Sequence, residues 1–198
     1  MSRVVGILLA AGQSSRFGSN KCMALLPDKT PMGLQSARNL ASHVEALVVV
    51  IPPENPALAA MFVGEGFKTV ICPTAALGMS ESLKSGICYF DDTKPHAYLI
   101  ALADMPVIKP ETYRVTVAAL KQGADISSPQ CQNKRGHPVG FNAKYRNELL
   151  ALKGDQGAKV LFQKYHKTLT LLAVDDPGIH QDFDTRILFE QCFNDPTS

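Results

Sequence analysis

The chain has 198 residues, of which 45% are hydrophobic and 19% are charged, and its formal net charge is +2. This composition is typical of a globular protein rather than of a disordered or fibrous chain, and the length fits one domain. The small net charge, without a basic stripe or a run of like charges, disfavours a nucleic-acid partner. Small molecules are therefore the expected ligands.

The cysteines and the apolar start of the chain indicate where the protein works. The five cysteines are odd in number and widely spaced, which disfavours a disulfide framework or a zinc site. The apolar run at residues 4–10 is short and leads into Gly12 and Ser14, and no segment approaches the roughly 20 apolar residues of a membrane span. We therefore expect a cytoplasmic protein with no membrane partner.

Apolar runs rich in Val and Ile alternate with amphipathic stretches in the first half. The runs predict strands at 4–10, 46–51, 68–72 and 97–103, and the stretches predict helices at 32–42, 56–65 and 79–90. Strands that are apolar throughout are typical of a parallel sheet covered on both faces. The alternation favours an α/β fold with three layers, α/β/α, Rossmann-like, around a mostly parallel central sheet.

The second half is less regular. It predicts helices at 110–121, 143–151 and 156–165 and a last helix after Asp184, with strands near 125–128 and 168–174. Residues 134–138 are interpreted as a polar loop. No linker, repeat or low-complexity tract divides the chain, so residues 1–198 are predicted to form a single domain whose second half completes the same sheet.

The segment that follows the first predicted strand, Leu9 to Lys21, combines small residues with two cations. Ligands of an open parallel sheet bind beyond the carboxyl ends of its strands. Small residues let backbone N–H groups point at a phosphate, while Arg16 can bind two of its oxygens and Lys21 supplies a point charge. The glycine spacing fits neither a Walker-type loop nor a dinucleotide fingerprint. The alternative is an exposed turn, but the two cations favour a polyphosphate site.

This loop resembles the signature Leu-Ala-Ala-Gly-x-Ser-x-Arg-[Met/Phe]-Gly-x-x-Lys of the molybdenum-cofactor nucleotidyltransferases. The resemblance continues through Leu25-Leu26-Pro27, Gly78-Met79-Ser80-Glu81-Ser82-Leu83, Ala103-Asp104-Met105-Pro106, Gly136-His137-Pro138-Val139 and Gly154-Asp155-Gln156-Gly157-Ala158. It covers nearly the whole chain and is strongest to the cytidylyltransferases of the family, because guanylyltransferase relatives usually have Leu-Ala-Gly-Gly where this chain has Ala10-Ala11-Gly12.

The resemblance implies a nucleotidyltransferase fold and a magnesium-dependent reaction. CMP would pass from CTP to the terminal phosphate of molybdopterin (the molybdenum cofactor), and pyrophosphate would leave. A recipient molybdoenzyme is a further possible partner. The residues implied to bind the nucleotide are Leu9, Ala10, Ala11, Gly12, Ser14, Ser15, Arg16, Lys21, Gly78 and Ser82. Arg16, Lys21 and Asp104 are the implied catalytic residues.

Two carboxylates are candidate Mg²⁺ ligands. Asp104 stands where a predicted buried strand ends, and Mg²⁺ prefers carboxylate, water and phosphate oxygens. The alternative for Asp104 is a turn cap. Asp184 is implied by the resemblance of Asp182-Phe183-Asp184-Thr185 to the segment that opens the family's last helix, with Asp182 as a structural residue. A plain helix cap is the alternative for Asp184.

Three further motifs have both a binding and a structural interpretation. Gly78 and Ser82 lie where a helix begins, and helix N-termini attract phosphates, whereas Ser80 is also a natural helix cap. His137, beside Lys134 and Arg135, is a candidate substrate-binding residue or a turn residue. Asp155 is a candidate substrate-binding residue or the end of a loop.

Other functions remain open. Within the same class, the chain could be a guanylyltransferase acting on the same cofactor or a transferase acting on a sugar or polyol phosphate. From another class, it could be a nucleotide-binding protein that delivers the cofactor without chemistry. The set of Arg16, Lys21 and Asp104 argues against a pure binding protein, which has less need of a metal carboxylate. No Ser-His-Asp or Cys-His pairing is apparent, consistent with an attacking group that is already anionic.

Overall fold

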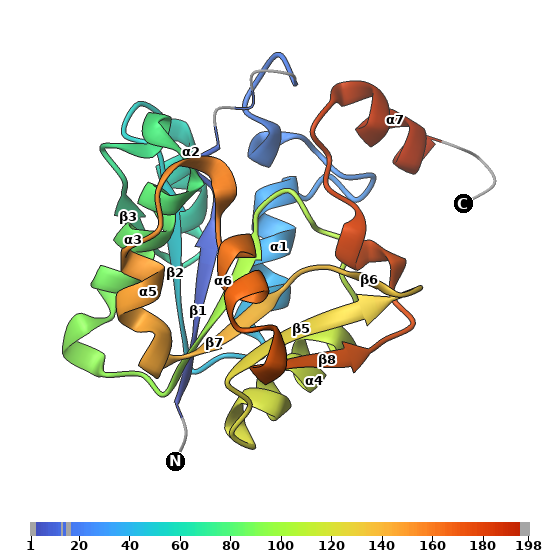
Figure 1. Ribbon diagram of the computed structural model, residues 1–198. Coiled ribbons are helices and arrows are strands. Elements are labelled where there is room, and N and C mark those ends of the chain that lie inside the picture. The colour runs from blue at the N-terminus through green and yellow to red at the C-terminus, as the bar shows by residue number, and fades with distance from the viewer. Residues whose placement is uncertain (1–2, 13, 15–16, 195–198) are drawn as a thin grey trace.

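The computed structural model of the chain describes residues 3–12, 14 and 17–194. In this part of the chain, eight strands form one sheet (Figure 1). They are β1 (Val4–Leu9), β2 (Ala46–Ile51), β3 (Lys68–Ile71), β4 (Ala97–Leu102), β5 (Ile126–Cys131), β6 (Lys134–Arg135), β7 (Val139–Asn142) and β8 (Leu169–Ala173). The order across the sheet is β3-β2-β1-β4-β7-β5-β6, and β8 pairs with β5.

The sheet is mostly parallel, as predicted. β1 pairs in parallel with β2 and β4, β2 with β3, and β5 with β8. β7 runs antiparallel to both β4 and β5, and β6 runs antiparallel to β5. The carboxyl ends of β1, β2 and β4 therefore meet at one edge, where the candidate motifs lie.

Strands β6 and β7 correct the interpretation of residues 134–138 as a simple loop, because Lys134 and Arg135 form β6. The hairpin of β5 and β6 could not be predicted from the sequence, because β6 is only two residues long and exposed. Such a short strand shows no alternation of apolar and polar residues. In β7, Gly140 lies opposite Leu99 of β4, and a Cβ at this glycine would lie 2.4 Å from the Ser127 hydroxyl oxygen. The close approach of β5 and β7 thus requires glycine.

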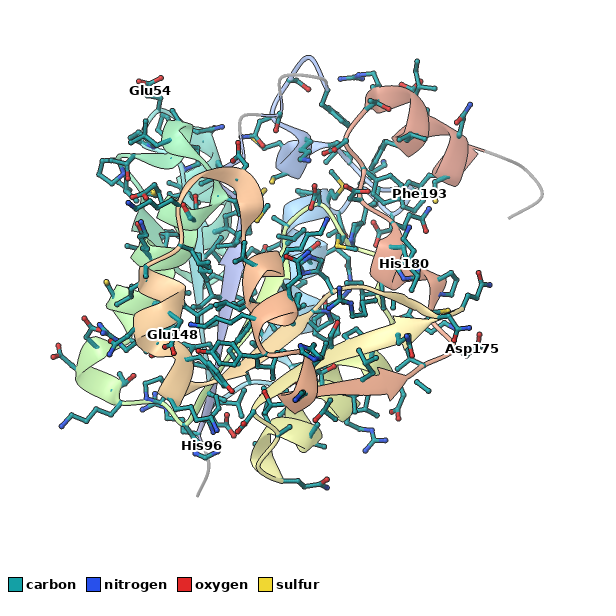
Figure 2. All side chains as sticks on the ribbon, in the orientation of Figure 1. Glu54, His96, Glu148, Asp175, His180 and Phe193 are labelled. Atoms are coloured by element: carbon teal, nitrogen blue, oxygen red, sulfur yellow. The ribbon has the colours of Figure 1, made fainter. Side chains whose placement is uncertain are left out.

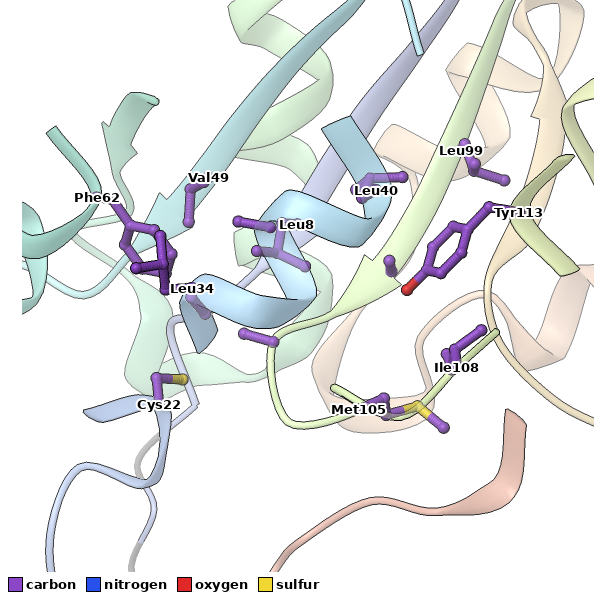
Figure 3. Close-up of a cluster of buried hydrophobic side chains, with 14 of the residues drawn as sticks. Leu8, Cys22, Leu34, Leu40, Val49, Phe62, Leu99, Met105, Ile108 and Tyr113 are labelled. Atoms are coloured by element: carbon purple, nitrogen blue, oxygen red, sulfur yellow. The ribbon is translucent and has the colours of Figure 1, made fainter. Parts of the chain in front are cut away.

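Helices cover both faces of the sheet, which confirms the three layers. They are α1 (Met32–Ala41), α2 (Pro56–Gly64), α3 (Met79–Tyr89), α4 (Pro110–Lys121), α5 (Arg146–Leu150), α6 (Lys159–Lys164) and α7 (Arg186–Asn194). Because side chains alternate along a strand, Val4 and Leu8 of β1 pack with α1, α2 and α4, while Val5 and Ile7 pack with α3, α5 and α6. Figure 3 shows the first of these two clusters, with Leu8 among its members.

Local sequence explains where individual helices begin. Asn55 caps α2, its side-chain oxygen accepting a hydrogen bond from the Leu58 N–H at 2.9 Å, and Pro56 supplies the first helical residue. The full burial of Phe62 later in this helix contributes about 1.5–3 kcal/mol. On the other face, a Cβ at Gly86 would lie 2.4 Å from Ile7, so α3 can pack closely on β1.

Two predicted helices are shorter than expected. The segment 143–151 divides into a 3-10 turn at Ala143–Tyr145 and α5, and the segment 156–165 becomes helical only at Lys159. Gly157 has a φ of 53°, in the left-handed region that interrupts a right-handed helix. Among all the helices of the described residues, none has both the length and the apolarity needed to cross a membrane.

Candidate active site

The loop that follows β1 forms the first wall of the site. The Ala10 N–H donates to the Val50 carbonyl at 2.9 Å, which directs the chain across the end of β2. Ala10 and Ala11 are buried, whereas a Cβ at Gly12 would have no protein atom within 4 Å. This backbone therefore faces open space, as binding of a phosphorylated ligand requires.

The structure describes only some of the predicted site residues in the rest of this loop. Ser14 has a φ of 50°, and its hydroxyl oxygen accepts from the Lys21 N–H at 3.3 Å. The hydroxyl thus ties the middle of the loop to the 3-10 turn Lys21–Met23. Ser15 and Arg16 lie outside the described residues, so their roles stay predictions.

Lys21 brings two distant carboxylates together. Asn20 caps the turn by accepting from the Cys22 N–H at 3.0 Å. The Lys21 ammonium then lies 2.5 Å from Asp104 Oδ2 and 2.6 Å from Asp184 Oδ1. The exposed fractions of the side chains are 13% for Lys21, 12% for Asp104 and 43% for Asp184, so the first of these ion pairs is well shielded from water.

The position of Asp104 is fixed by α1. β4 ends at Leu102, and the next two residues cross the end of the sheet. The Ser36 hydroxyl donates to the Ala103 carbonyl at 3.0 Å, and the Asn39 side-chain amide donates to the Pro106 carbonyl at 2.9 Å. These bonds hold both sides of Asp104, and its buried carboxylate points into the site.

Asp182 and Asp184 reach the same place through Phe183. The Phe183 N–H donates to the Asp104 carbonyl at 3.2 Å, and the Phe183 ring is buried against Leu26 and Met32. In an extended segment the two neighbours of a buried residue point the opposite way. One oxygen from each of Asp104, Asp182 and Asp184 can lie within 4.8 Å of the others. Asp182, for which a structural role was the alternative, therefore belongs to this acidic cluster, and the Asp-x-Asp alternation was the signal for it.

The charges of the cluster favour a bound cation. Burial lowers the pKa of Lys21, but Asp104 and Asp184 outweigh it, so the pKa is raised and the ammonium persists. The pKa of Asp182 is raised by burial and by the charges of Asp184 and Asp104. Among the described residues of the cluster, one ammonium faces three carboxylates, and such hard oxygen donors suit a divalent ion such as Mg²⁺ or Mn²⁺.

The start of α3 forms the facing wall, with a different arrangement from the one expected. The Asp155 carboxylate accepts from the Met79 N–H at 3.0 Å and so caps the helix N-terminus beside Gly78 and Ser82, which stay predicted nucleotide contacts. Gly78 has a φ of 122°, and a Cβ there would lie 2.6 Å from the Gly154 carbonyl carbon, so packing explains this glycine. Ser80 is buried and does not cap the helix, whereas Ser82 faces the cleft.

These walls enclose a central cleft of about 260 Å³. It is lined by Leu9, Ala10, Ala11, Gly12, Lys21, Cys22, Ala75, Met79, Ser82, Leu102, Ala103, Asp104, Asp155, Asp182 and Asp184. A second hollow of about 510 Å³ adjoins it and shares Ala11, Gly12 and Ala75. Sites for small molecules usually have roughly 300–1,000 Å³, so the two spaces together suit a nucleotide better than the cleft alone.

His137 lies beside the cleft rather than in it. Its main-chain N–H donates to the Ile179 carbonyl at 3.1 Å, and the peptide bond to Pro138 is cis. Burial lowers the pKa of the imidazole, although the charge of Asp104 and the Ile100 backbone oppose this effect. The nearby turn Pro177–His180 is held by the buried Asp176, whose carboxylate accepts from the Lys109 N–H and the Thr112 hydroxyl at 2.8 and 2.6 Å. Asp176 was not predicted from the sequence, because its partners are about 65 residues away.

A small-residue loop at the end of a parallel strand, facing a lysine and three carboxylates, is the site of a nucleotidyltransferase, and comparison with known proteins agrees. The model of the MobA-like NTP transferase domain matches residues 6–182. The chain belongs to this family.

Individual relatives are distant but extend over the full length. The purine catabolism protein PucB of Bacillus subtilis is 26% identical over an alignment of 192 positions, which covers 92% of each protein. The structure of Rv0371c from Mycobacterium tuberculosis is similar with a TM-score of 0.83 at 22% identity, covering 97% of this chain and 98% of that one. A manganese complex of Rv0371c has a TM-score of 0.79 at 21% identity and covers 98% and 99%.

One solved neighbour carries a cofactor-related name. Molybdopterin-guanine dinucleotide biosynthesis protein A of Archaeoglobus fulgidus has a TM-score of 0.70 at 16% identity, covering 96% of this chain and 97% of that one. At such identities the structural comparisons show the shared fold.

Proposed function

We propose that this nucleotidyltransferase transfers CMP from CTP to the terminal phosphate of the molybdenum cofactor (molybdopterin), in a reaction that needs Mg²⁺. The observation that carries the proposal is the cluster of Asp104, Asp182 and Asp184 around Lys21, directly beside the loop after β1. Phosphoryl-type transfer depends mainly on positioning and charge compensation, and this cluster supplies both.

In this proposal each wall of the cleft has its own task. Ala10, Ala11 and Gly12 offer backbone groups to the nucleotide, and Lys21 compensates charge on its phosphates. Asp104, Asp182 and Asp184 would hold the metal, and a bound Mg²⁺ would supply positive charge beside the phosphorus under attack. Arg16, outside the described residues, keeps its predicted role on the phosphates.

The proposal also includes the cellular compartment of the protein and the enzyme that receives its product. All five cysteines, each within the described residues, are free thiols, as is common in a reducing compartment. We therefore propose that the protein works in the cytoplasm. The product dinucleotide would then pass to a recipient molybdoenzyme.

A panel of nucleotides tests the reaction. The protein is incubated with Mg²⁺, molybdenum cofactor and one of CTP, GTP, ATP or UTP, and released pyrophosphate is measured. We expect release with CTP only, and a loss of about 100-fold or more in Asp104→Asn. Asp175→Asn is the matched control, since Asp175 is an exposed carboxylate outside the cleft (Figure 2). Release with GTP alone, or with no nucleotide, would contradict the proposal.

The choice of base is tested at Ala11. This residue lines both the cleft and the adjoining hollow, and guanylyltransferase relatives usually have glycine there. Removing its methyl group enlarges the space, so Ala11→Gly should raise kcat/KM for GTP relative to CTP by roughly tenfold or more. An unchanged ratio would show that Ala11 does not select the base.

A further inference from the structure

A second set of polar residues lies on the far side of the acidic cluster. Lys134, Arg135, His137 and His180 line a hollow of about 210 Å³, which we term the basic hollow. Leu102 and Asp182 line both this hollow and the central cleft. Because Asp182 lines both spaces, a molecule in the basic hollow would lie next to the acidic cluster.

The two hollows lie on opposite sides of the cleft. The hollow that shares Ala11 and Gly12 with the cleft also contains Glu54, whereas the basic hollow contains His180. Figure 2 shows Glu54 and His180 far apart, on opposite sides of the molecule in that view. The site therefore runs from one hollow through the cleft to the other, with the acidic cluster toward the basic end.

The described charged residues differ between these two ends. Among the described residues that line the hollow with Glu54, there is no lysine or arginine. The basic hollow has Lys134 and Arg135, and Asp182 is its one carboxylate among the described lining residues. The Arg135 guanidinium is supported over the Phe162 ring at 5.0 Å, which leaves its planar edge for an anion.

The imidazole of His137 supplies a further polar atom in a fixed position. Its Nδ1 is buried and has no hydrogen-bond partner among the described residues. The residue before it, Gly136, packs so tightly that a Cβ would lie 2.2 Å from the Ile179 carbonyl oxygen. His180 Nε2 contacts the Lys134 carbonyl at 2.8 Å and so links the two chain segments of the hollow. Buried polar atoms are normally hydrogen-bonded, so an unpaired ring nitrogen that lines a hollow is a candidate contact for a bound molecule.

We infer that the basic hollow binds the acceptor, whose phosphomonoester group is held by Arg135 and Lys134 while the imidazole of His137 contacts a polar group of the same molecule. This inference rests on the proposed function for the direction of the reaction. An acceptor phosphate oxygen attacks the α-phosphorus of the nucleotide and forms the new P–O bond. The bond from that phosphorus to the bridging oxygen breaks, and pyrophosphate leaves with the electron pair.

Histidine NMR tests the site without turnover. Protein with ¹⁵N-labelled histidine is saturated with Mg²⁺ and α,β-methylene-CTP, which occupies the nucleotide site, and is titrated with methyl phosphate. We expect saturable shifts of the His137 and His180 ring signals, and at least a tenfold weaker apparent Kd in Lys134→Gln/Arg135→Gln. Both substituted residues are exposed, so the variant should fold, which circular dichroism checks. The control is Lys68→Gln/Lys167→Gln, which removes the same charge at exposed positions outside the basic hollow.

The outcomes separate this inference from the proposed function. Unmoved histidine signals, or equal Kd values in the two double variants, would overturn the basic hollow as the acceptor site. If pyrophosphate release fails with all four nucleotides but methyl phosphate still binds with the expected dependence on Arg135 and Lys134, only the proposed function is refuted. In a working assay, the Lys134→Gln/Arg135→Gln variant should raise the acceptor KM at least tenfold and leave the CTP KM within twofold.

Discussion

Replacement of Lys21 by methionine should destabilise the protein, and mainly when no divalent metal is present. The substitution keeps most of the side-chain volume and removes the ammonium that lies 2.5 Å from Asp104 and 2.6 Å from Asp184. Two unit charges separated by the 4.8 Å limit of the cluster repel each other by about 3.5 kcal/mol at an effective dielectric constant of about 20. In Lys21→Met this ammonium no longer offsets the repulsion, so protonation of a carboxylate becomes more favourable.

The expected loss is about 2–3 kcal/mol. Removing one partner of a fully buried ion pair costs roughly 3–5 kcal/mol, but the Asp184 side chain is 43% exposed, so solvent screens part of the effect. For a chain of this size, 1 kcal/mol corresponds to about 2–4 °C in Tm. We therefore expect the Tm of Lys21→Met in EDTA to fall by about 5–10 °C.

Thermal unfolding with EDTA and with Mg²⁺ or Mn²⁺ is the assay. A cation that binds only the folded cluster stabilises it, and the gain should be larger in Lys21→Met because the ion meets no ammonium there. Arg38→Met is the control. Arg38 pairs with Glu65 at 2.7 Å, but both side chains are more than 40% exposed, so the free energy of unfolding should fall by less than about 1 kcal/mol. This loss should be the same with and without metal. A wild-type Tm for Lys21→Met in EDTA, or a deficit that metal does not reduce, would refute the reasoning.

Three further predictions concern other positions. Gly12→Ala places a methyl group in open space beside the cleft, so the nucleotide KM should rise roughly tenfold without a loss of Tm. Gly64→Ala, equally free of clashes but at the end of α2, should leave the KM unchanged and keep or slightly raise the Tm. Burial, with Asp104 nearby, raises the pKa of Cys22 to about 12, so iodoacetamide followed by mass mapping should modify exposed Cys88 and spare Cys22. Burial lowers the pKa of His43 below 6.5, so the neutral imidazole stabilises the fold above that pH. This contribution to stability is lost as the pH falls through the folded-state pKa. The free energy of unfolding measured in urea should therefore depend less on acid pH in His43→Gln than in the wild type.

The regular part of the fold could be predicted because its signals are local. The strand Ala46–Ile51 and the helix Pro110–Lys121 agree with the sequence prediction residue for residue. In the strand, a continuous apolar run ends at two prolines. In the helix, Pro110 opens an amphipathic stretch that Gly123 closes soon after its end. β6 and β7 lack such signals, since their pairing with β5 and β4 is decided by packing across the sheet.

The site was predicted only as far as its parts act locally. Asp104 is a predicted metal ligand because it follows a buried strand, and Asp184 because of the family resemblance. The structure brings both carboxylates to Lys21, and their role as ligands stays a prediction. The contact of Asp155 with the N-terminus of α3 joins residues 76 positions apart, and no sequence pattern near Asp155 predicts it. Likewise, Gly78 was assigned to the nucleotide, although its backbone is shaped by the approach of Gly154. Contacts between distant segments decide such roles, and one sequence does not display them.

The geometry of the cluster also depends on α7. Asp184 lies just before this helix, and Phe189 within it packs against Phe183 with ring centroids 5.6 Å apart. The same Phe189 ring meets Phe17 at 6.0 Å, and the Arg186 guanidinium lies over the Phe17 ring at 5.5 Å. α7 therefore holds the loop after β1 and the segment of Asp184 against each other, as their neighbouring positions in Figure 1 illustrate. Because the small-residue loop and the segment of Asp184 both pack on α7 through Phe189, we expect a shift of this helix to move both together. Packing on a common helix is thus one way in which a cluster built from such distant segments keeps its position beside the cleft.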